Sequence, residues 1–285
     1  MEINTPGLLA LTISDEPFLE EATTAPLKIE CIDIETQDIS EYVVKFNNRV
    51  TRNGCGIASE IICGHLAKYF DIQIPDFGLV EITETLYRSI SDFSKSHIYT
   101  SRMLTTINSN RHGLNFGSKI MTGTMTSPTT INVKKDELEK IAAVEDIFAF
   151  DALIYNADRN NNIHNLLVAD NKYYVYDHEK AFCFLSSSNP STPNKLDFRT
   201  PGRNGVQFLK EHLFKSCLND KEIDFDRFLG KLGKLDDKTL ANIIKEIPWE
   251  IRTDHKGELS TIISHIKNVR ENPETFRLNL LRVLA

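Results

Sequence analysis

The residue types best suited to chemistry are concentrated in two short stretches, NADRNNNIHN (156–165) and YDHEKAF (176–182). Aspartate and asparagine offer hard oxygen ligands of the kind that magnesium prefers. A phosphoryl-transfer site needs this set, because one Asp orients the attacking hydroxyl while an Asn and a second Asp hold the metal that bridges the phosphates of ATP. Asp158, Asn165 and Asp177 are therefore the candidate residues.

A predicted β-hairpin would bring these candidates together. The short apolar segments 165–168 and 173–176 lie on either side of ADNK, which is predicted to form the turn. With that turn, residues whose numbers sum to about 341 face each other across the hairpin. Asn165 then faces the end of the second strand and Asp177 follows directly after it. Asp158 lies in the loop that leads to the same end.

The same stretch also has a plain structural interpretation. Asn and Asp are common in turns because they tolerate left-handed backbone and form Asx-turns, so DRNNN could be only a tight turn. His164 and His178 could be packing or capping residues. The hairpin geometry favours the metal-site interpretation, but the sequence leaves both open.

The segments around these stretches predict an α+β fold that changes character along the chain. PLKIECIDI (26–34) and EYVVKFN (41–47) form a predicted hairpin, and GIASEIICGHLAKYFDI (56–72) has helical spacing of its apolar residues. GLNFGSKIM (113–121) is a predicted strand. A long helix is predicted over 134–156, and the chain beyond about residue 205 is predicted to be helical. We therefore expect a β-rich first part and a mainly helical second part.

Composition is that of an ordinary globular protein. The chain has 285 residues, of which 41% are hydrophobic and 26% charged, which suits one large domain or two lobes. Five cysteines are scattered singly with no CxxC pair, so neither a disulfide framework nor a zinc site is indicated. We expect reduced, mostly buried thiols.

Charge and hydropathy argue against several classes of partner. The formal net charge of −7 argues against an extended surface that binds nucleic acid directly. No apolar run reaches the length of a membrane span, and the first residues carry acids where a secretory signal has basic residues. We expect a cytoplasmic protein with no membrane contact.

Taken together, FDALIYNADRNNNIHNLLV (150–168) and YYVYDHEKAF (173–182) resemble the catalytic core of HipA-like kinases. These are atypical bacterial serine/threonine kinases related in fold to eukaryotic protein kinases. The loop is also similar to the N-x-D-R-x-x-x-N loop of phosphatidylinositol kinases. Upstream, YVVKF matches the strand with the ATP-binding lysine, here Lys45, and ASEIICGHLAKYFDIQIP matches the helix with its acidic partner, here Glu60. The resemblance, closest to the smaller HipA-like branch, covers most of the chain.

The resemblance implies a bilobal protein-kinase-like fold, with a β-rich N-lobe at 1–125 and a mainly helical C-lobe at 126–285. It implies an ATP- and Mg²⁺-dependent serine/threonine protein kinase, of an autophosphorylating, toxin-like type. A protein substrate is expected with it, and an antitoxin or regulatory partner is a further implication. Two alternatives stay open, which are a pseudokinase that serves as an interaction module and a kinase that acts on a lipid or a small molecule.

Carried over residue by residue, the resemblance assigns a role to each candidate. Asp158 orients and deprotonates the acceptor hydroxyl, and Asn165 and Asp177 hold magnesium. Lys45 contacts the α- and β-phosphates, and Glu60 holds Lys45 in place through an ion pair. The plain alternatives are a strand lysine that extends into solvent for Lys45, and a surface glutamate near a helix start for Glu60.

The chain departs from these families at several positions. In phosphatidylinositol kinases the magnesium Asn lies five positions after the Asp, where this chain has Ile163, so Asn165 is the first choice and Asn162 the alternative. The glycine that usually follows the second Asp is missing. The loop EEATTA is not glycine-rich, and Thr23 and Thr24 are candidates either for ATP-phosphate binding or for autophosphorylation.

Overall fold

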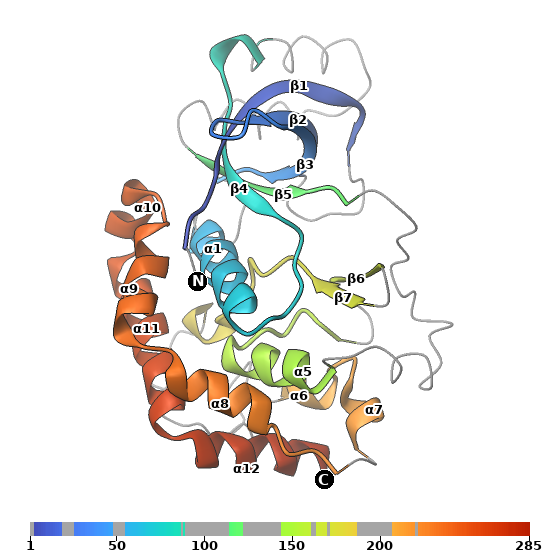
Figure 1. Ribbon diagram of the computed structural model, residues 1–285, viewed down its shortest axis with the longest axis vertical. Helices are drawn as coiled ribbons and strands as arrows, with labels where there is room; N and C mark the ends of the chain where they lie inside the picture. The colour runs from blue at the N-terminus through green and yellow to red at the C-terminus, as the bar shows by residue number, and fades with distance from the viewer. Residues whose placement is uncertain are drawn as a thin grey trace.

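The computed structural model describes residues 3–18, 26–47, 55–86, 88, 114–121, 144–160, 164–169, 172–186, 207–219 and 222–285. Within these ranges the chain has a mixed α+β structure, in which a strand barrel occupies one end and helices occupy the other (Figure 1). Thr23, Thr24 and Asn162 lie outside the described residues, as does the segment around residue 125. None of the described helices is long and apolar enough to cross a membrane.

Five described strands close into a barrel in the order β1-β2-β3-β5-β4. Their bounds are Gly7–Phe18 for β1, Leu27–Asp33 for β2, Ile39–Lys45 for β3, Phe77–Glu81 for β4 and Asn115–Lys119 for β5. β1 runs parallel to β4, and the other neighbours are antiparallel. The predicted β2–β3 hairpin is confirmed. Alternate residues of β2, namely Leu27, Ile29 and Cys31, face the interior of the barrel, where they pack against apolar residues of β1 and β3.

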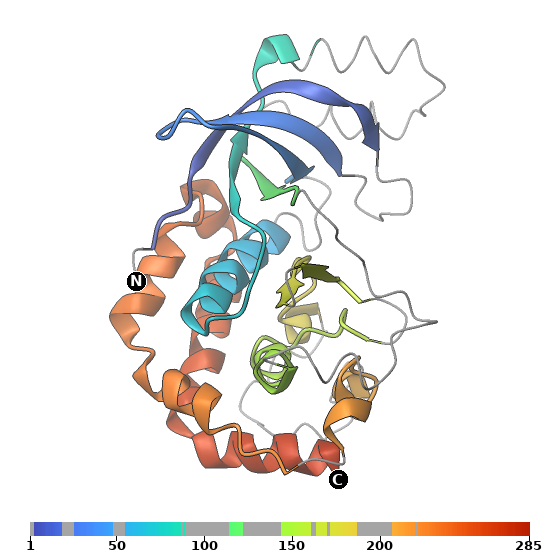
Figure 2. The ribbon, with the colours of Figure 1, turned by 45° about the vertical axis from the view of Figure 1, so that its right-hand side comes forward.

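Helix α1, Cys55–Tyr69, lies between the barrel and the helical end, as Figures 1 and 2 show. It is buried along almost its whole length, because β5, Phe77 of β4, α9 and α10 all pack against it. A Cβ atom at Gly64 would lie 2.5 Å from Phe77 Cε1, so only glycine allows this approach to β4. The helix ends where Asp71 takes a left-handed conformation with φ 58° and the Ile72 N–H donates to the Ala67 carbonyl oxygen.

The two segments predicted to carry the chemistry follow helix α5, Val144–Leu153. This helix is shorter at its end than the predicted 134–156, because Tyr155 leaves the helical region with φ 48°, and 134–143 lie outside the described residues. The hairpin consists of β6, Leu166–Ala169, and β7, Lys172–Val175. Its register pairs Leu166 with Val175 and Ala169 with Lys172, which confirms the predicted register. The Val175 N–H also donates to the Gln73 carbonyl oxygen, which fixes the hairpin to the segment after α1.

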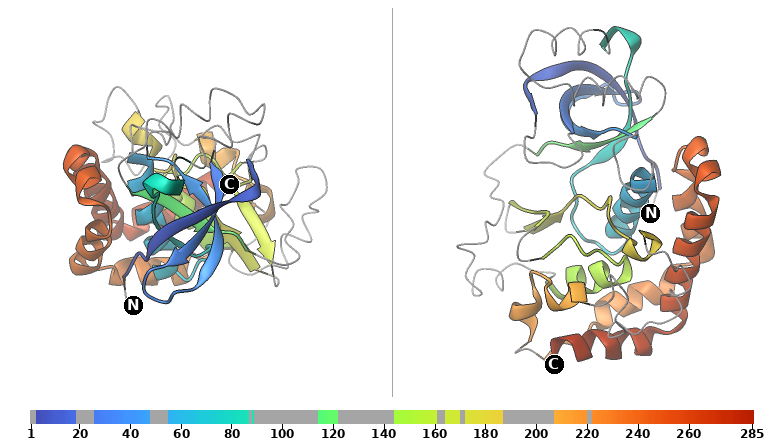
Figure 3. Two further views of the ribbon diagram at one scale, coloured as in Figure 1. Left: turned by 90° about the horizontal axis from the view of Figure 1, so that it is seen from above. Right: turned by 180° about the vertical axis from the view of Figure 1, so that it is seen from behind.

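The rest of the described chain is helical, as the sequence predicts. A 3₁₀ helix, η2, spans Cys183–Ser186, and the α-helices are α6 Gln207–Lys210, α7 Lys215–Leu218, α8 Asp226–Lys234, α9 Asp237–Lys245, α10 Trp249–Asp254, α11 Lys256–Glu271 and α12 Pro273–Leu284. Figure 3 shows α9, α10 and α11 along one side of the molecule and α12 across its end. The aromatic rings of Phe70 and Phe228 stack at 4.3 Å, which joins α8 to the end of α1. Four of the five cysteines are buried, and all five are free thiols.

The N-terminal residues are fixed to α1 and α9 by two hydrogen bonds. The Thr5 hydroxyl lies 2.7 Å from His65 Nε2, and the Thr5 N–H donates to Glu246 Oε2 at 2.7 Å. His65 is 1% exposed, and burial, with a smaller contribution from Lys68, lowers the pKa of His65 to about 4. The imidazole is therefore neutral in the folded protein at every pH above that value.

We expect this histidine to contribute to acid sensitivity. The unfolded chain binds a proton at His65 below pH ~6.5, whereas the folded protein does not until about pH 4, so stability falls as the pH is lowered through this window. Replacing His65→Gln should remove up to about 3 kcal/mol of that loss. Urea unfolding of both proteins at pH 7 and pH 4.5 measures the difference. The same pH dependence in both proteins would contradict the assignment.

Candidate functional site

Lys45, the last residue of β3, is enclosed by three carboxylates from other parts of the chain. Its Nζ atom lies 2.5 Å from Glu60 Oε1 on α1 and 2.5 Å from Asp177 Oδ1, which follows β7. Glu179 Oε2 lies 3.7 Å away. The Lys45 side chain is 10% exposed and that of Glu60 is 3% exposed, so neither is the surface residue of the plain interpretations.

The charges of this cluster stabilise one another. Burial alone would lower the pKa of Lys45, but Glu60, Asp177 and Glu179 together raise it above its ordinary value. Burial would raise the pKa of Glu60, but Lys45 and a hydrogen bond involving His178 lower it. Lys45 and Glu60 are therefore both ionised, as a buried ion pair requires.

Glu179 is a member of the site that the sequence analysis missed. Its side chain is 4% exposed, and burial raises its pKa to about 7, although Lys45 acts in the opposite direction. Asp177 and Glu60 add to the rise, because they are negative charges close to the same ammonium group. The only sequence signal is its position two residues after Asp177, within the charged run DHEK.

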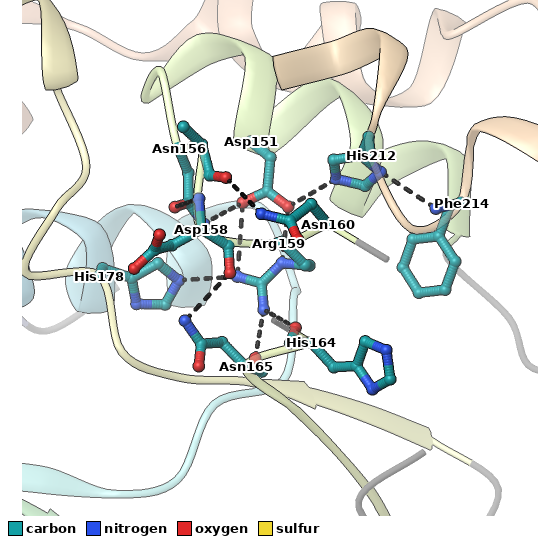
Figure 4. Close-up of polar contacts among 11 residues, drawn as sticks. Asp151, Asn156, Asp158, Arg159, Asn160, His164, Asn165, His178, His212 and Phe214 are labelled. Atoms are coloured by element: carbon teal, nitrogen blue, oxygen red, sulfur yellow. Dashed lines mark hydrogen bonds and ion pairs between the residues drawn. The ribbon is translucent and has the colours of Figure 1, made fainter. Parts of the chain in front are cut away.

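Asp158 lies at the same end of the β6–β7 hairpin. Its N–H donates to Asn156 Oδ1 at 3.1 Å, and Asn165 Nδ2 donates to its carbonyl oxygen at 3.1 Å (Figure 4). Its carboxylate Oδ2 lies 2.8 Å from the Nζ atom of Lys180, a second residue that the sequence analysis missed. The Asp158 side chain is 17% exposed, so the carboxylate remains within reach of a bound molecule.

Two of the predicted residues have left-handed backbone. Asn165 has φ 43° and Asp177 has φ 59°, at facing ends of the two strands. The Tyr176 N–H donates to the Asn165 carbonyl oxygen at 3.2 Å, which extends the hairpin by one pair, as predicted. The structure thus brings Asp158, Asn165 and Asp177 to one end of the hairpin, where Lys45 joins them.

Arg159 hydrogen-bonds the backbone at this end of the hairpin and links it to α5. Its guanidinium is fully buried, and its Nε donates to Asp151 Oδ2 of α5 at 2.6 Å. The Nη1 atom donates to the carbonyl oxygens of His164 and Asn165, so it fixes the backbone that carries the candidate metal ligand (Figure 4). Arg159 therefore holds the loop and does not contact solvent.

Asp151 is the centre of this buried network. Besides Arg159 it accepts hydrogen bonds from Asn156 Nδ2 and His212 Nε2, both at 2.9 Å. His212 Nδ1 in turn accepts from the Phe214 N–H, so its proton is on Nε2. Burial would raise the pKa of Asp151, but Arg159 and His212 hold it below its ordinary value.

His178 connects the Arg159 network to the Lys45 cluster. Its Nε2 lies 3.3 Å from Arg159 Nη2, which can only donate, so Nε2 accepts and the proton is on Nδ1. Nδ1 faces Glu60 Oε2 at 3.8 Å, and the His178 backbone N–H donates to the same oxygen at 2.9 Å. A continuous polar path therefore runs from α5 to β3, and His178 is more than a packing residue.

The residues that could hold a metal ion are few. Among the described residues, no group of three or more His, Cys, Asp and Glu side chains is placed to bind one. Asp177 and Asn165 could do so together with the oxygens of a bound phosphate, which is how magnesium is usually held at phosphoryl-transfer sites. Because Nδ2 of Asn165 is directed to the Asp158 carbonyl oxygen, its amide oxygen faces the opposite way.

Comparisons with known proteins locate this site within one family. The model of the family described as HipA-like kinase matches residues 31–191, which is more than half of the chain. The match includes Lys45, Glu60 and the site residues from Asp151 to Lys180, whereas His212 lies outside it. No curated protein matches the chain.

One similar solved structure is the complex of Neurospora crassa PAN2 (WD40-CS1) with PAN3 (pseudokinase and C-term). It is 12% identical, with 97% of this chain and 66% of that chain covered and a TM-score of 0.32. At this TM-score the likeness supports no conclusion on fold or function.

Because Asp151 is at the centre of the buried network, we expect the loss of its charge to destabilise the folded protein strongly. Asp151→Asn should lower the free energy of unfolding by about 3–5 kcal/mol, because it leaves the Arg159 charge buried without its partner. Urea unfolding monitored by fluorescence measures the change. Asp237→Asn is the matched control, since Asp237 also pairs with an arginine, Arg270, but on the surface. An equally small effect of both substitutions would contradict the central role of Asp151.

Proposed function

This chain belongs to the HipA-like kinase family, and on that premise we propose that it transfers the γ-phosphoryl group of ATP to a serine or threonine hydroxyl of a protein in a magnesium-dependent reaction. The observation that carries the proposal is the contact of Lys45 with both Glu60 and Asp177. Phosphoryl transfer needs a cation for the phosphates and a carboxylate for the metal within one triphosphate length of each other. Here these groups already touch.

The proposed fold is the bilobal one of protein kinases, with an N-lobe at 1–125 and a C-lobe at 126–285. The barrel and the helical end of the molecule support this division, since Lys45 belongs to the barrel and Asp177 to the hairpin beside the helices. ATP would then bind where β3, α1 and the β6–β7 hairpin meet. A phosphate contact of Thr23 and Thr24 remains a prediction, because both lie outside the described residues.

In this proposal Lys45 binds the α- and β-phosphates and Glu60 positions it. The ammonium group is a compact point charge with three donors, which suits phosphate oxygens. Glu60 is itself held by the His178 backbone N–H, so the lysine is aimed before the nucleotide arrives. Lys45 also contacts the carboxylates of Asp177 and Glu179. In the complex, the phosphates would lie beside these carboxylates or take their place next to the ammonium group.

The residues present fit a divalent cation. The carboxylates of Glu60, Asp158 and Asp177 stand against the ammonium groups of Lys45 and Lys180, which is an excess of one formal negative charge. Glu179, whose pKa is raised to about 7, adds further negative charge as it ionises. Asp177 and the amide oxygen of Asn165 would hold the ion. When bound, magnesium neutralises charge on the β- and γ-phosphates.

Asp158 is the proposed residue for the acceptor. Its carboxylate accepts the hydrogen bond of the incoming hydroxyl and directs the oxygen at the γ-phosphorus. The new O–P bond forms as the bond from the γ-phosphorus to the β,γ-bridging oxygen breaks, and that electron pair leaves with ADP. The hydroxyl proton passes to Asp158. Positioning supplies most of the rate, because the loose transition state needs little covalent help.

The acceptor is proposed to be a protein, and autophosphorylation is the simplest form of the reaction. An antitoxin or other regulatory protein as a partner remains a proposal of the same kind. Both proposals follow from the family to which the chain belongs.

Asp158→Asn should separate chemistry from binding. We expect ATP affinity to stay within several-fold, while phosphoryl transfer falls roughly 10²-fold or more, the usual contribution of general-base help. Incubation with magnesium and ATP, followed by intact-mass measurement, reports phosphorylation of the chain, and calorimetry reports binding. Transfer at the wild-type rate would show that Asp158 is only a turn residue.

Asp177→Asn should remove the dependence of ATP binding on magnesium, because the amide no longer offers an anionic ligand. Calorimetry with and without the metal ion measures this dependence. Asp71→Asn, in which a surface carboxylate that pairs with Lys231 is changed, is the control and should behave as the wild type. If magnesium leaves the ATP affinity of the wild-type protein unchanged, the proposed function is wrong.

A further inference from the structure

Lys180 is the second lysine of the site, and no motif of the sequence identifies it. Its Nζ atom lies 2.8 Å from Asp158 Oδ2. From this contact we propose that Lys180 is a catalytic residue that binds the γ-phosphate of ATP and fixes Oδ2 of Asp158. The inference rests on the proposed function and adds a residue to it.

The backbone on either side of Lys180 is buried and hydrogen-bonded. The residues before and after it, Glu179 and Ala181, are 3% and 0% exposed. The Ala181 N–H donates to the His178 carbonyl oxygen at 2.9 Å, and the Phe182 N–H donates to the Ile154 carbonyl oxygen at 2.6 Å. The turn therefore directs successive side chains to fixed places, with Glu179 toward Lys45 and Lys180 toward Asp158.

The Lys180–Asp158 ion pair is expected to contribute little to the stability of the fold. The side chains of Lys180 and Asp158 are 41% and 17% exposed, and ion pairs with such access to water contribute little to folding. Burial would lower the pKa of Lys180, but the hydrogen bond that it donates to Asp158 and the charges of the nearby carboxylates raise it. A cation is thus maintained next to the residue that receives the acceptor hydroxyl.

The contact gives the two carboxylate oxygens of Asp158 different roles. Oδ2 is committed to Lys180, so Oδ1 is the oxygen we assign to the acceptor hydroxyl and its proton. The ammonium group has three donors, and one is used by Asp158. The others can reach oxygens of the γ-phosphate, because Asp158 must lie next to that group to aim a hydroxyl at it. Lys45 and Lys180 would then bind opposite ends of the triphosphate.

The test compares nucleotides with and without the γ-phosphate. Calorimetry would measure the affinities of a non-hydrolysable ATP analogue and of ADP, each with magnesium, for the wild type, Lys180→Met and Lys180→Arg. For Lys180→Met we expect the analogue to bind roughly tenfold more weakly or worse, the size of a lost charge-assisted hydrogen bond, while ADP binding stays within about twofold. Lys180→Arg should restore part of the loss. Lys267→Met, which breaks a surface pair with Asp237, is the matched control and should change neither affinity.

The outcomes separate the two proposals. If Lys180→Met weakens the analogue and ADP equally, or weakens neither, Lys180 does not contact the γ-phosphate and this inference is wrong while the proposed function stands. If the wild-type protein binds neither nucleotide, the proposed function fails, and this inference fails with it. A thermal unfolding midpoint for Lys180→Met that equals the wild-type value confirms that the comparison concerns folded protein.

Discussion

A buried lysine ammonium group is the constraint on which the rest of the structure depends. A cation with almost no access to water is tolerated only when carboxylates surround it. Lys45 obtains them from Glu60 on α1 and from Asp177 and Glu179 after β7, so three distant segments of the chain must converge on one atom. The ion pairs of Lys45 therefore join the barrel, the buried helix and the hairpin at one point, in addition to the apolar core that they share.

Arg159 is a second buried cation, and it likewise has a buried carboxylate partner. That partner is Asp151 of α5, and the Nη1 atom of Arg159 donates to two backbone carbonyl oxygens. His178 lies between the two centres and fixes its own proton position by accepting from Arg159. Removal of either cation would leave a buried carboxylate without its partner, which is strongly destabilising.

The sequence predicts those parts of the site that local patterns determine. Hairpin register follows from the length of the turn, and Lys45 and Glu60 follow from the resemblance of short segments. Glu179 and Lys180 could not be found in the same way, because their partners lie far away in the chain, at Lys45 and Asp158. The same holds for the contact of Asp151 with His212, which are 61 residues apart. The end of α5 was misplaced because Tyr155 leaves the helix without a glycine or proline to mark it.

The two interpretations of the asparagine- and aspartate-rich stretch turn out to be compatible. Asn165 and Asp177 have φ 43° and φ 59°, and Asn and Asp are the side chains other than glycine that enter this region most readily. Glycine would relieve the backbone but would supply no oxygen ligand. A residue that must both turn the chain and offer a hard oxygen is therefore restricted to these two types. Because the hairpin places both residues at the same end, the requirement of the turn and the requirement of the proposed metal site select the same side chains.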